Sequence, residues 1–374
     1  MQSVFWFLAF IGHGALWVEL VNRLHGLGWN RKLIDFFTQL CGAACCGLPL
    51  VAAAILLLRS PGEAAPSWLV AYAWLSIAAL AVVAVTRVGL HWDPSRDRRT
   101  KITRVVPVEL HAKLGRGATR DRTLDRIATL PGNTLLRPQL EHLTVPLERL
   151  PKPLEGLRVA HLTDLHMSGR LTEAYFAELV DEVNAWRPDL VCVTGDIVEH
   201  TPQLEWVDTT LGRLESTLGS YFVLGNHDAK IDAAELRRRL AEAGLVDVGG
   251  LLAAVERQGE TITLCGDERP WFVAEPPLTG AESLVLCLAH TPDRFGWAVR
   301  QSVDLVLAGH NHGGQVCFPA IGPLLCPSRH GVRYAAGTFR RGRTVMHVGR
   351  GSGSLFPLRY NCPPEVALLT LTKG

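Results

Sequence analysis

Residues 305–315 read LVLAGHNHGGQ. The four apolar residues at 305–308 are typical of a strand that is buried on both faces of a sheet. Two residues with metal-binding side chains, His310 and His312, follow that strand at once. Ligand sites in open α/β sheets lie just beyond the carboxyl ends of strands. The stretch therefore predicts an α/β fold with a site at the point where the chain leaves this strand.

The same arrangement recurs at four other predicted strands, over residues 158–163, 190–193, 221–224 and 284–288. The residues that follow them share metal-ligating or proton-transferring side chains and are Asp164, His166, Asp196, Asn226, His227, Asp228 and His290. Taken singly each is weak evidence, because a lone histidine at the end of a strand is usually structural. Five strands that deliver such side chains to one edge together predict a metal centre.

Strand and helix patterns alternate through the last two thirds of the chain. Amphipathic helices are predicted at residues 173–186 and 233–243. Further strands are predicted at residues 262–265, 345–348 and 366–371. This alternation is typical of an α/β sheet enclosed by helices.

The first ninety residues carry most of the apolar excess of the chain. Three apolar runs cover residues 3–21, 36–58 and 67–85, and each is close to the about 20 residues that a membrane-spanning helix needs. The first run is the weakest of the three, because Glu19 is costly in lipid unless it lies near an end. We expect three spans; the alternative is a buried helical hairpin of a soluble protein.

Basic residues at the ends of the runs predict the orientation, because cytoplasmic loops carry an excess of Lys and Arg. The loop after the first run and the stretch after the third share this excess, with Arg23, Arg31, Lys32, Arg87, Arg96, Arg98, Arg99, Lys101 and Arg104. The opposite side has Arg59. We expect a multi-pass protein of the inner (cytoplasmic) membrane, with its amino terminus outside and its large carboxy-terminal portion in the cytoplasm. Nine irregularly spaced cysteines agree with reducing surroundings.

The composition changes suggest three parts: a transmembrane helical segment at 1–90, a basic juxtamembrane linker at 91–155 and an α/β domain at 156–374. Residues 91–122 are rich in Arg and Lys, which suits either contact with anionic lipid headgroups or a solvated linker. The whole chain has a net charge of only +2, so no nucleic-acid partner is expected.

The order of the motifs resembles that of the calcineurin-like metallophosphoesterase superfamily. Asp-x-His, Gly-Asp, Gly-Asn-His-Asp, His and Gly-His-x-His follow one another between about residues 156 and 372. The stretch at 309–315 and the tail RYNCPPE at 359–365 are similar to a membrane-associated bacterial branch. That branch includes phosphodiesterases and one type of UDP-2,3-diacylglucosamine hydrolase. The resemblance implies a β-sandwich of two mixed sheets flanked by helices.

The resemblance also implies two divalent metal ions. Residues at the matching positions would bind the first ion through Asp164, His166 and His312. Those for the second ion would be Asn226, His290 and His310. Asp196 would bridge the two ions. Mixed imidazole and carboxylate ligands favour Mn, Fe or Zn over Mg or Ca.

For catalysis, the resemblance implies in-line attack by a metal-bound hydroxide on phosphorus. His227 falls at the position of the family's catalytic histidine and would protonate the leaving group. Asp228 falls at the position of its partner carboxylate. The backbone N–H groups of Gly313 and Gly314 would approach the phosphate, or they form a plain tight turn.

Several cationic side chains are further candidates for substrate contacts, with surface solvation as the alternative for each. Arginine suits bidentate recognition of phosphate. The candidates are Arg294, His330, Arg340, Arg350 and Arg359.

These observations predict a membrane-anchored phosphoesterase. A phosphodiester or pyrophosphate in a lipid or nucleotide-lipid, such as UDP-2,3-diacylglucosamine, is the favoured substrate, because a tethered domain works where such molecules reside. A general phosphomonoesterase or protein phosphatase is the alternative, since the same metal pair serves both reactions. A membrane scaffold without catalysis is the third reading, which the intact set of predicted ligands disfavours.

Overall fold

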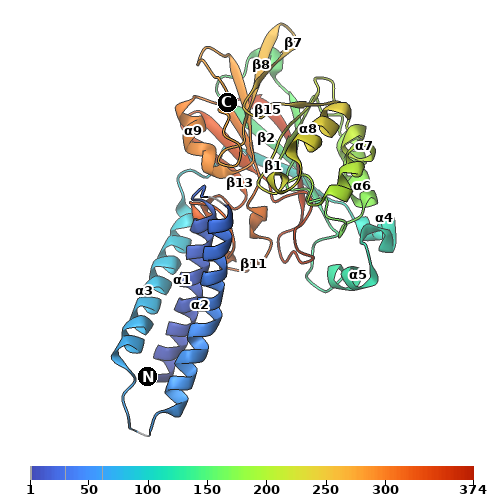
Figure 1. The fold of residues 1–374 in the computed structure, drawn as a ribbon. Helices are drawn as coiled ribbons and strands as arrows, with labels where there is room; N and C mark the ends of the chain where they lie inside the picture. The colour runs from blue at the N-terminus through green and yellow to red at the C-terminus, as the bar shows by residue number, and fades with distance from the viewer. Residues whose placement is uncertain (1, 30, 61) are drawn as a thin grey trace. The chain divides into compact units, whose positions relative to one another are not determined.

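The computed structural model describes residues 2–29, 31–60 and 62–374, drawn as a ribbon in Figure 1. The chain divides into two compact units. The first comprises Met1–Pro94 and Pro327–Arg333, and the second comprises Ser95–Cys326 and Tyr334–Gly374. A short segment late in the sequence therefore belongs to the amino-terminal unit.

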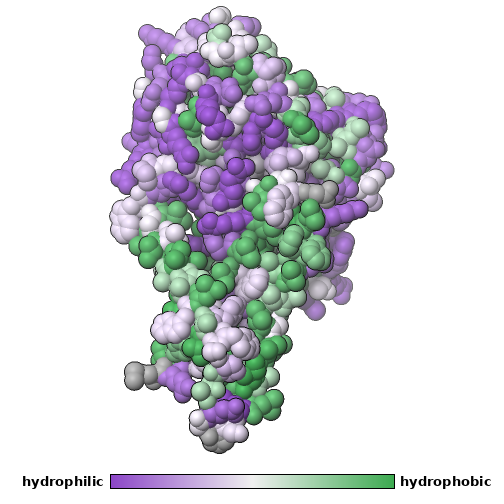
Figure 2. All heavy atoms as spheres, turned by 60° about the vertical axis from the view of Figure 1, so that its left-hand side comes forward, coloured by the Kyte–Doolittle hydropathy of each residue, from purple (hydrophilic) through white to green (hydrophobic). Residues whose placement is uncertain are grey.

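Within the described residues, the first unit contains three long helices, α1 (Gln2–His25), α2 (Arg31–Leu58) and α3 (Ser67–Gly89). All three are long and apolar enough to cross a membrane, and α1 has the lowest mean hydropathy, 1.7 against 2.3 and 2.2. Hydrophobic residues cover much of the surface of these helices in Figure 2. The predicted apolar helices are confirmed.

Polar groups inside the three helices find partners on neighbouring turns or helices. His13 is buried, its Nδ1 lies 2.6 Å from the Tyr72 hydroxyl, and its Nε2 lies 2.9 Å from the Cys45 carbonyl oxygen. Glu19 pairs with Arg23 one turn later at 2.5 Å. Such pairing lowers the cost of polar groups in lipid. It explains how the first helix accommodates the acidic residue that weakened its prediction.

The segment Pro327–Arg333 packs against the same unit. Arg333 donates two hydrogen bonds to the carboxylate of Asp93, at 2.6 and 2.7 Å. Gly26 follows α1, and a Cβ placed on it would lie 2.0 Å from the backbone nitrogen of Arg329. Only glycine allows this close backbone approach.

Among the described residues, the second unit contains two large mixed sheets. The strands of the first sheet are, in spatial order, β1 (Lys101–Pro107), β2 (Gln139–Leu147), β15 (Glu365–Lys373), β3 (Arg158–Leu162), β4 (Leu190–Thr194), β5 (Ser220–Val223) and β6 (Leu245–Asp247). Those of the second are β13 (Gly337–Arg341), β14 (Thr344–Val348), β10 (Leu305–Ala308), β9 (Leu284–Ala289), β8 (Glu260–Asp267) and β7 (Leu252–Arg257). A small hairpin is formed by β11 (Cys317–Phe318) and β12 (Gly322–Pro323).

The strands that precede the predicted ligands run parallel to their neighbours. In the first sheet β3 pairs with β4 and β4 with β5 in parallel, and in the second sheet β9 pairs with β10 in parallel. Antiparallel pairs lie at the outer strands of the second sheet, between β7 and β8 and between β13 and β14, and inside the first sheet between β15 and β3. The mixed topology confirms the fold that the motifs implied.

Helices flank the sheets. They are α4 (Leu110–Leu114), α5 (Arg122–Ala128), α6 (Glu173–Ala185), α7 (Trp206–Thr209), α8 (Ala233–Glu242) and α9 (Phe295–Arg300). The predicted apolar face of α6, with Phe176, Leu179 and Val183, is buried in the core beneath it. A second core includes Leu286 and Leu369, which belong to different sheets, so it fills the space between them.

The region 91–155 differs from the predicted linker. Its residues include β1 and β2, and β2 pairs with β15 in parallel over its full length. Leu143, Val145 and Leu147 are buried and alternate with less buried residues, which is the period of a strand. Pro146 lies within this strand.

We predict that Leu369→Ala lowers the free energy of unfolding of the second unit by about 2–5 kcal/mol, because a buried leucine leaves a cavity between the sheets. Val246→Ala is the control, because Val246 lies in an edge strand and is 43% exposed. It should change the free energy of unfolding by no more than about 0.5 kcal/mol. Urea unfolding of the detergent-purified chain, followed by circular dichroism, measures both. Equal effects of the two substitutions would contradict this assignment of the core.

Candidate metal centre

The predicted ligands all lie in loops that follow parallel strands. Those in the first sheet come after β3, β4 and β5, and those in the second come after β9 and β10. The first set is Asp164, His166, Asp196 and Asn226. The second set is His290, His310 and His312. The structure brings these seven residues, from two sheets, to one place.

One group of potential ligand atoms belongs to Asp164, His166, Asp196 and His312, all buried and all within 4.8 Å of one another. His166 Nε2 lies 2.9 Å from His312 Nε2 and 3.6 Å from Asp196 Oδ2. His312 Nε2 also lies 3.3 Å from Asp164 Oδ1. The three residues predicted for the first ion, together with the predicted bridge, thus form one cluster.

A second group of potential ligand atoms belongs to Asp196, His290 and His310. His290 Nε2 lies 3.3 Å from Asp196 Oδ2 and 3.1 Å from Asn226 Oδ1. Asp196 is therefore shared by both groups. This is the position that a carboxylate bridging two metal ions needs.

The backbone is strained at five of the seven candidate ligands. Their φ angles are 51° for Asp164, 45° for His166, 52° for Asp196, 71° for His310 and 50° for His312. Left-handed conformations cost residues with a Cβ atom about 1–2 kcal/mol each. Such strain persists where the surrounding structure enforces it, and it gathers at functional sites. The strand ends turn sharply here, which directs the side chains into a shared space.

Two glycines in the motifs make room for the carboxylates. A Cβ placed on Gly225 would lie 2.3 Å from Asp196 Oδ1, and one placed on Gly309 would lie 2.2 Å from Asp164 Oδ2. Both distances are far below contact distance. The glycines of Gly-Asn-His-Asp and Gly-His-x-His are thus required by the close approach of the ligand carboxylates.

The hydrogen bonds of two histidines fit metal binding. His290 Nδ1 donates to the carbonyl oxygen of Thr194 at 2.7 Å, and His166 Nδ1 donates to the carboxylate of Glu199 at 3.1 Å. Each ring then directs Nε2 toward the cluster. Histidines that bind metals commonly donate their other ring N–H to an oxygen in this way. The buried carboxylates and imidazoles, together with the half-buried amide of Asn226, therefore fit divalent metal ions.

The field of the carboxylates favours a cation at this place. Burial lowers the pKa of His290, but Asp196 and Asp164 outweigh that effect and raise the pKa to about 9. The negative charge that stabilises a proton on His290 stabilises a metal cation in the same way. A metal ion bound to Nε2 has to displace that proton.

His227 lies at the edge of the first group. Its ring makes an edge-to-face contact with the ring of His166, with 4.8 Å between the centroids. Its backbone N–H donates to Asp196 Oδ1 at 2.7 Å. Its Nδ1 contacts Glu199 Oε1, and its side chain is 14% exposed. The imidazole is thus held beside the ligands and still reaches the surface.

Sequence reasoning missed Glu199. This buried carboxylate lies between His166 and His227 and contacts both rings. Burial would raise the pKa of Glu199, but hydrogen bonds from the two histidines outweigh it and lower the pKa below its usual range. The available signal was its place in Gly-Asp-Ile-Val-Glu, three residues after Asp196 in the same strand-end loop.

The structure corrects the role predicted for Asp228. Its buried carboxylate accepts hydrogen bonds from the backbone N–H groups of Ile197, Val198 and Gly225, at 2.8, 3.1 and 2.8 Å. Asp228 therefore ties the loop after β4 to the loop after β5. The carboxylate on the imidazole of His227 comes from the neighbouring loop instead. Adjacent side chains of this turn point in different directions, which the motif alone does not show.

Arg359 is also corrected, because it is fully buried. Its guanidinium donates to the carbonyl oxygens of Arg350 and Gly353 at 2.8 and 2.6 Å, and to His312 Nδ1 at 3.2 Å. It holds the tail before β15 against a candidate ligand. A guanidinium used in this way is not available to a substrate.

The other cationic candidates are paired or lie elsewhere. Arg294 pairs with Asp267 at 2.7 Å, Arg340 with Asp97 at 3.0 Å, and Arg350 with Glu141 at 2.6 Å. His330 belongs to the segment Pro327–Arg333 of the first unit. Their pairing with carboxylates disfavours the three arginines as phosphate ligands.

Gly313 and Gly314 form the turn that follows His312. Both have positive φ angles, 60° and 81°, and Gly314 N–H donates to the carbonyl oxygen of Asn311 at 2.7 Å. The N–H of Gly314 therefore serves the turn. Approach of the Gly313 N–H to a phosphate stays a prediction.

Comparison with known proteins agrees with this geometry. Residues 157–314 match the family model of the calcineurin-like phosphoesterases. The chain is 31% identical over 222 residues to the phosphodiesterase YaeI of Escherichia coli, covering 57% of this chain and 82% of that protein. It is 28% identical over 243 residues to the metallophosphoesterase YkuE of Bacillus subtilis, covering 62% of this chain and 84% of that one.

A third relative is named as a transmembrane protein. The chain is 28% identical over 269 residues to a transmembrane protein with metallophosphoesterase domain of Danio rerio, covering 65% of this chain and 59% of the relative. The chain belongs to the calcineurin-like phosphoesterase family and is a metal-dependent phosphoester hydrolase. The resemblance predicted from the motifs is confirmed.

We predict that Asp196→Ala lowers Mn²⁺ content below one equivalent, because this carboxylate belongs to both ligand groups. His227→Ala is the matched control and keeps the content of the wild-type chain, since the ring lies beside the cluster. Elemental analysis of the purified proteins measures both. Full metal content in the Asp196→Ala protein would contradict the shared position of the carboxylate.

We also predict that Mn²⁺ binding releases a proton and strengthens as the pH rises from 6 to 8. His290 has a pKa of about 9 without metal and is protonated over this range, so the metal competes with the proton. One displaced proton corresponds to about tenfold in affinity per pH unit. Calorimetric titration in buffers of different ionisation enthalpy measures the released proton. Affinity that does not change with pH would contradict the prediction.

Proposed function

We propose that this chain is a membrane-anchored phosphoesterase that uses two divalent metal ions to cleave a phosphodiester or pyrophosphate bond. The observation that carries the proposal is the pair of ligand groups that share Asp196. Paired metal ions about 3.5–4 Å apart serve in-line displacement at phosphorus in many hydrolases. The name of the relative YaeI, a phosphodiesterase, supports the choice of a diester.

The residues assigned to the ions follow the two groups. The first ion would be held by Asp164, His166 and His312, and the second by Asn226, His290 and His310, with Asp196 between them. Mn, Fe or Zn suits these donors. Such ions, when bound, polarise a phosphoryl oxygen and lower the pKa of a water molecule. Only two of the seven ligands carry negative charge, so the loaded centre keeps a positive charge that attracts phosphate.

His227 would give a proton to the leaving alkoxide. The imidazole lies beside His166 at a 4.8 Å ring separation, and its 14% exposure lets it meet a substrate that enters from solvent. Glu199 accepts the hydrogen bond from Nδ1, which orients the ring. A histidine held by a carboxylate in this way is suited to general acid catalysis.

The membrane unit supports a lipid or nucleotide-lipid substrate, of which UDP-2,3-diacylglucosamine is one example. The described helices α1, α2 and α3 are each long and apolar enough to cross a bilayer. Tethering places the catalytic unit where lipid-linked phosphates are concentrated. The chemistry itself requires only an accessible diester or pyrophosphate.

Basic residues support an inner-membrane location with the catalytic unit in the cytoplasm. The loop after α1 carries Arg23 and Lys32 at its flanks, and several arginines follow α3, whereas Arg59 lies at the opposite ends of the helices. Cytoplasmic flanks are enriched in such residues. In this proposal residues 1–90 form the three-span anchor, and the catalytic domain includes β1 and β2 as well as residues 156–374.

Hydrolysis of bis-p-nitrophenyl phosphate and p-nitrophenyl phosphate by the detergent-purified chain with Mn²⁺ tests the function. We expect turnover of the diester, and its loss by about 10³-fold or more in Asp196→Ala. Turnover of the monoester alone would favour a phosphomonoesterase. No turnover of either by the metal-loaded protein would contradict a catalytic role.

Two substrates whose leaving groups differ in basicity distinguish proton donation by His227 from metal binding. His227→Ala is expected to cost about 10²-fold or more for a dialkyl phosphodiester, whose alkoxide needs a proton. The cost is smaller for bis-p-nitrophenyl phosphate, because p-nitrophenolate is a much weaker base. Equal losses for the two substrates would show that His227 does not protonate the leaving group.

A further inference from the structure

Two loops of the second unit expose large apolar side chains. One is the β11–β12 hairpin with the residues after it, and the other is the tail before β15. Their exposed apolar residues are Phe318, Ile321, Leu325, Phe356, Leu358 and Tyr360, each 38–60% accessible, and we call them the apolar rim. Single exposed apolar residues are ordinary on a soluble surface, whereas a gathering of them marks an interaction site.

The two loops of the apolar rim lie against each other. The rings of Phe318 and Tyr360 are 6.3 Å apart between centroids. The backbone N–H of Cys317 donates to the carbonyl oxygen of Tyr360 at 2.9 Å, and Val316 forms a bridge with the same residue. The apolar rim is therefore one surface built from segments about forty residues apart in the sequence.

The apolar rim adjoins the candidate metal centre. Gln315, three residues after the candidate ligand His312, accepts the backbone N–H of Tyr360 at 3.0 Å and the hydroxyl of Ser354 at 2.8 Å. On the other side of the tail, Gly353 N–H donates to the carbonyl oxygen of Asp164 at 3.0 Å. The loops that hold the ligands thus also carry the apolar rim.

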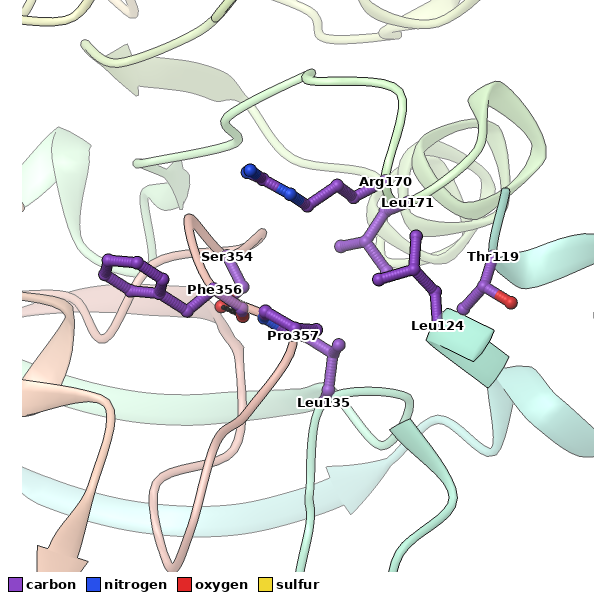
Figure 3. Close-up of a pocket in the computed structure, with 8 residues that line it drawn as sticks. All are labelled: Thr119, Leu124, Leu135, Arg170, Leu171, Ser354, Phe356 and Pro357. Atoms are coloured by element: carbon purple, nitrogen blue, oxygen red, sulfur yellow. Dashed lines mark hydrogen bonds between the residues drawn. The ribbon is translucent and has the colours of Figure 1, made fainter. Parts of the chain in front are cut away.

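A hydrocarbon-lined pocket lies beside Phe356. Its cavity volume is about 10 Å³, so it is a shallow hollow in the surface. Figure 3 shows the leucines and Pro357 gathered around it, with Arg170 along one side. The lining residues are Thr119, Leu124, Leu135, Arg170, Leu171, Ser354, Phe356 and Pro357. Leu171 and Arg170 follow His166 in the same loop, so the pocket too is built on a segment that carries candidate ligands.

The segment that contributes Leu124 to the pocket also carries exposed arginines, two of which, Arg116 and Arg120, lie near Asp125 and Asp121 of the same segment. Helix α5 contributes Leu124 to the lining, and the helix and the turn before it expose Arg116, Arg120, Arg122 and Arg126. Apolar side chains next to exposed arginines suit a bilayer surface, because the first enter the hydrocarbon and the second meet anionic headgroups.

We propose that the apolar rim and its pocket contact the acyl chains of bilayer lipids and present a lipid phosphate to the metal centre. The lipid contact stands by itself; the identity of that lipid as the substrate rests on the proposed function. A bilayer is favoured over a protein partner because the same chain carries apolar helices of membrane-spanning length. Moreover, Leu325 precedes by two residues the segment Pro327–Arg333, which belongs to the helical unit.

Photolabelling of the full chain in nanodiscs tests the lipid contact without any need for turnover. The bilayer contains phosphatidylcholine and phosphatidylglycerol with a diazirine on the acyl chain, and labelled peptides are found by mass spectrometry. We expect label on peptides that contain Ile321, Leu325 or Phe356. Peptides of α1, α2 and α3 are the positive control, and the peptide of Val273, which is 89% exposed on another loop, is the negative control.

Label confined to the three helices would overturn the proposal. A paired variant tests the same point by activity: Ile321→Ser with Phe356→Ser keeps turnover of soluble bis-p-nitrophenyl phosphate and loses at least about tenfold toward a phosphodiester lipid in vesicles. Equal turnover of the lipid by the variant and the wild type would also overturn it. If the wild type turned over neither substrate, the proposed function would be overturned. The photolabelling result alone would then decide whether the apolar rim contacts lipid.

Discussion

Two groups of metal-ligating side chains share one carboxylate, that of Asp196, and much of the second unit holds it in place. Its loop takes a left-handed turn directly after β4, with a φ of 52° at Asp196 itself. Gly225 leaves the space that the carboxylate fills, and Asp228 ties down the next two backbone N–H groups. A left-handed turn at a residue with a Cβ atom is unfavourable by itself. The packing between the two sheets provides the rigidity that sustains this strain.

The fold could be predicted because two signals indicate the same α/β sheet. These are the apolar runs of the strands and the metal-ligating residues that follow each run. Buried parallel strands show continuous apolar runs. Each run is followed by polar Asp, Asn or His residues, which a hydrophobic core does not favour. The strand β2 was not predicted, although Leu143, Val145 and Leu147 keep the period of a strand. Its membership in the sheet depends on pairing with β15, more than two hundred residues later, which local pattern does not reveal.

The site was predictable for its ligands and less so for the residues that support them. The seven ligands fall in short motifs with fixed spacing. The roles of Glu199, Asp228 and Arg359 depend instead on which way each side chain points from its loop, and all three are buried among backbone groups or rings. A buried arginine whose donors serve carbonyl oxygens looks the same in sequence as one that binds phosphate.

Anomalous X-ray diffraction from a Mn²⁺-soaked crystal would locate the metal ions around Asp196. We expect two manganese peaks, each within coordination distance of the carboxylate of Asp196, one beside His166 and the other beside His290. A single peak that does not touch Asp196, or no peak among these residues, would contradict this expectation.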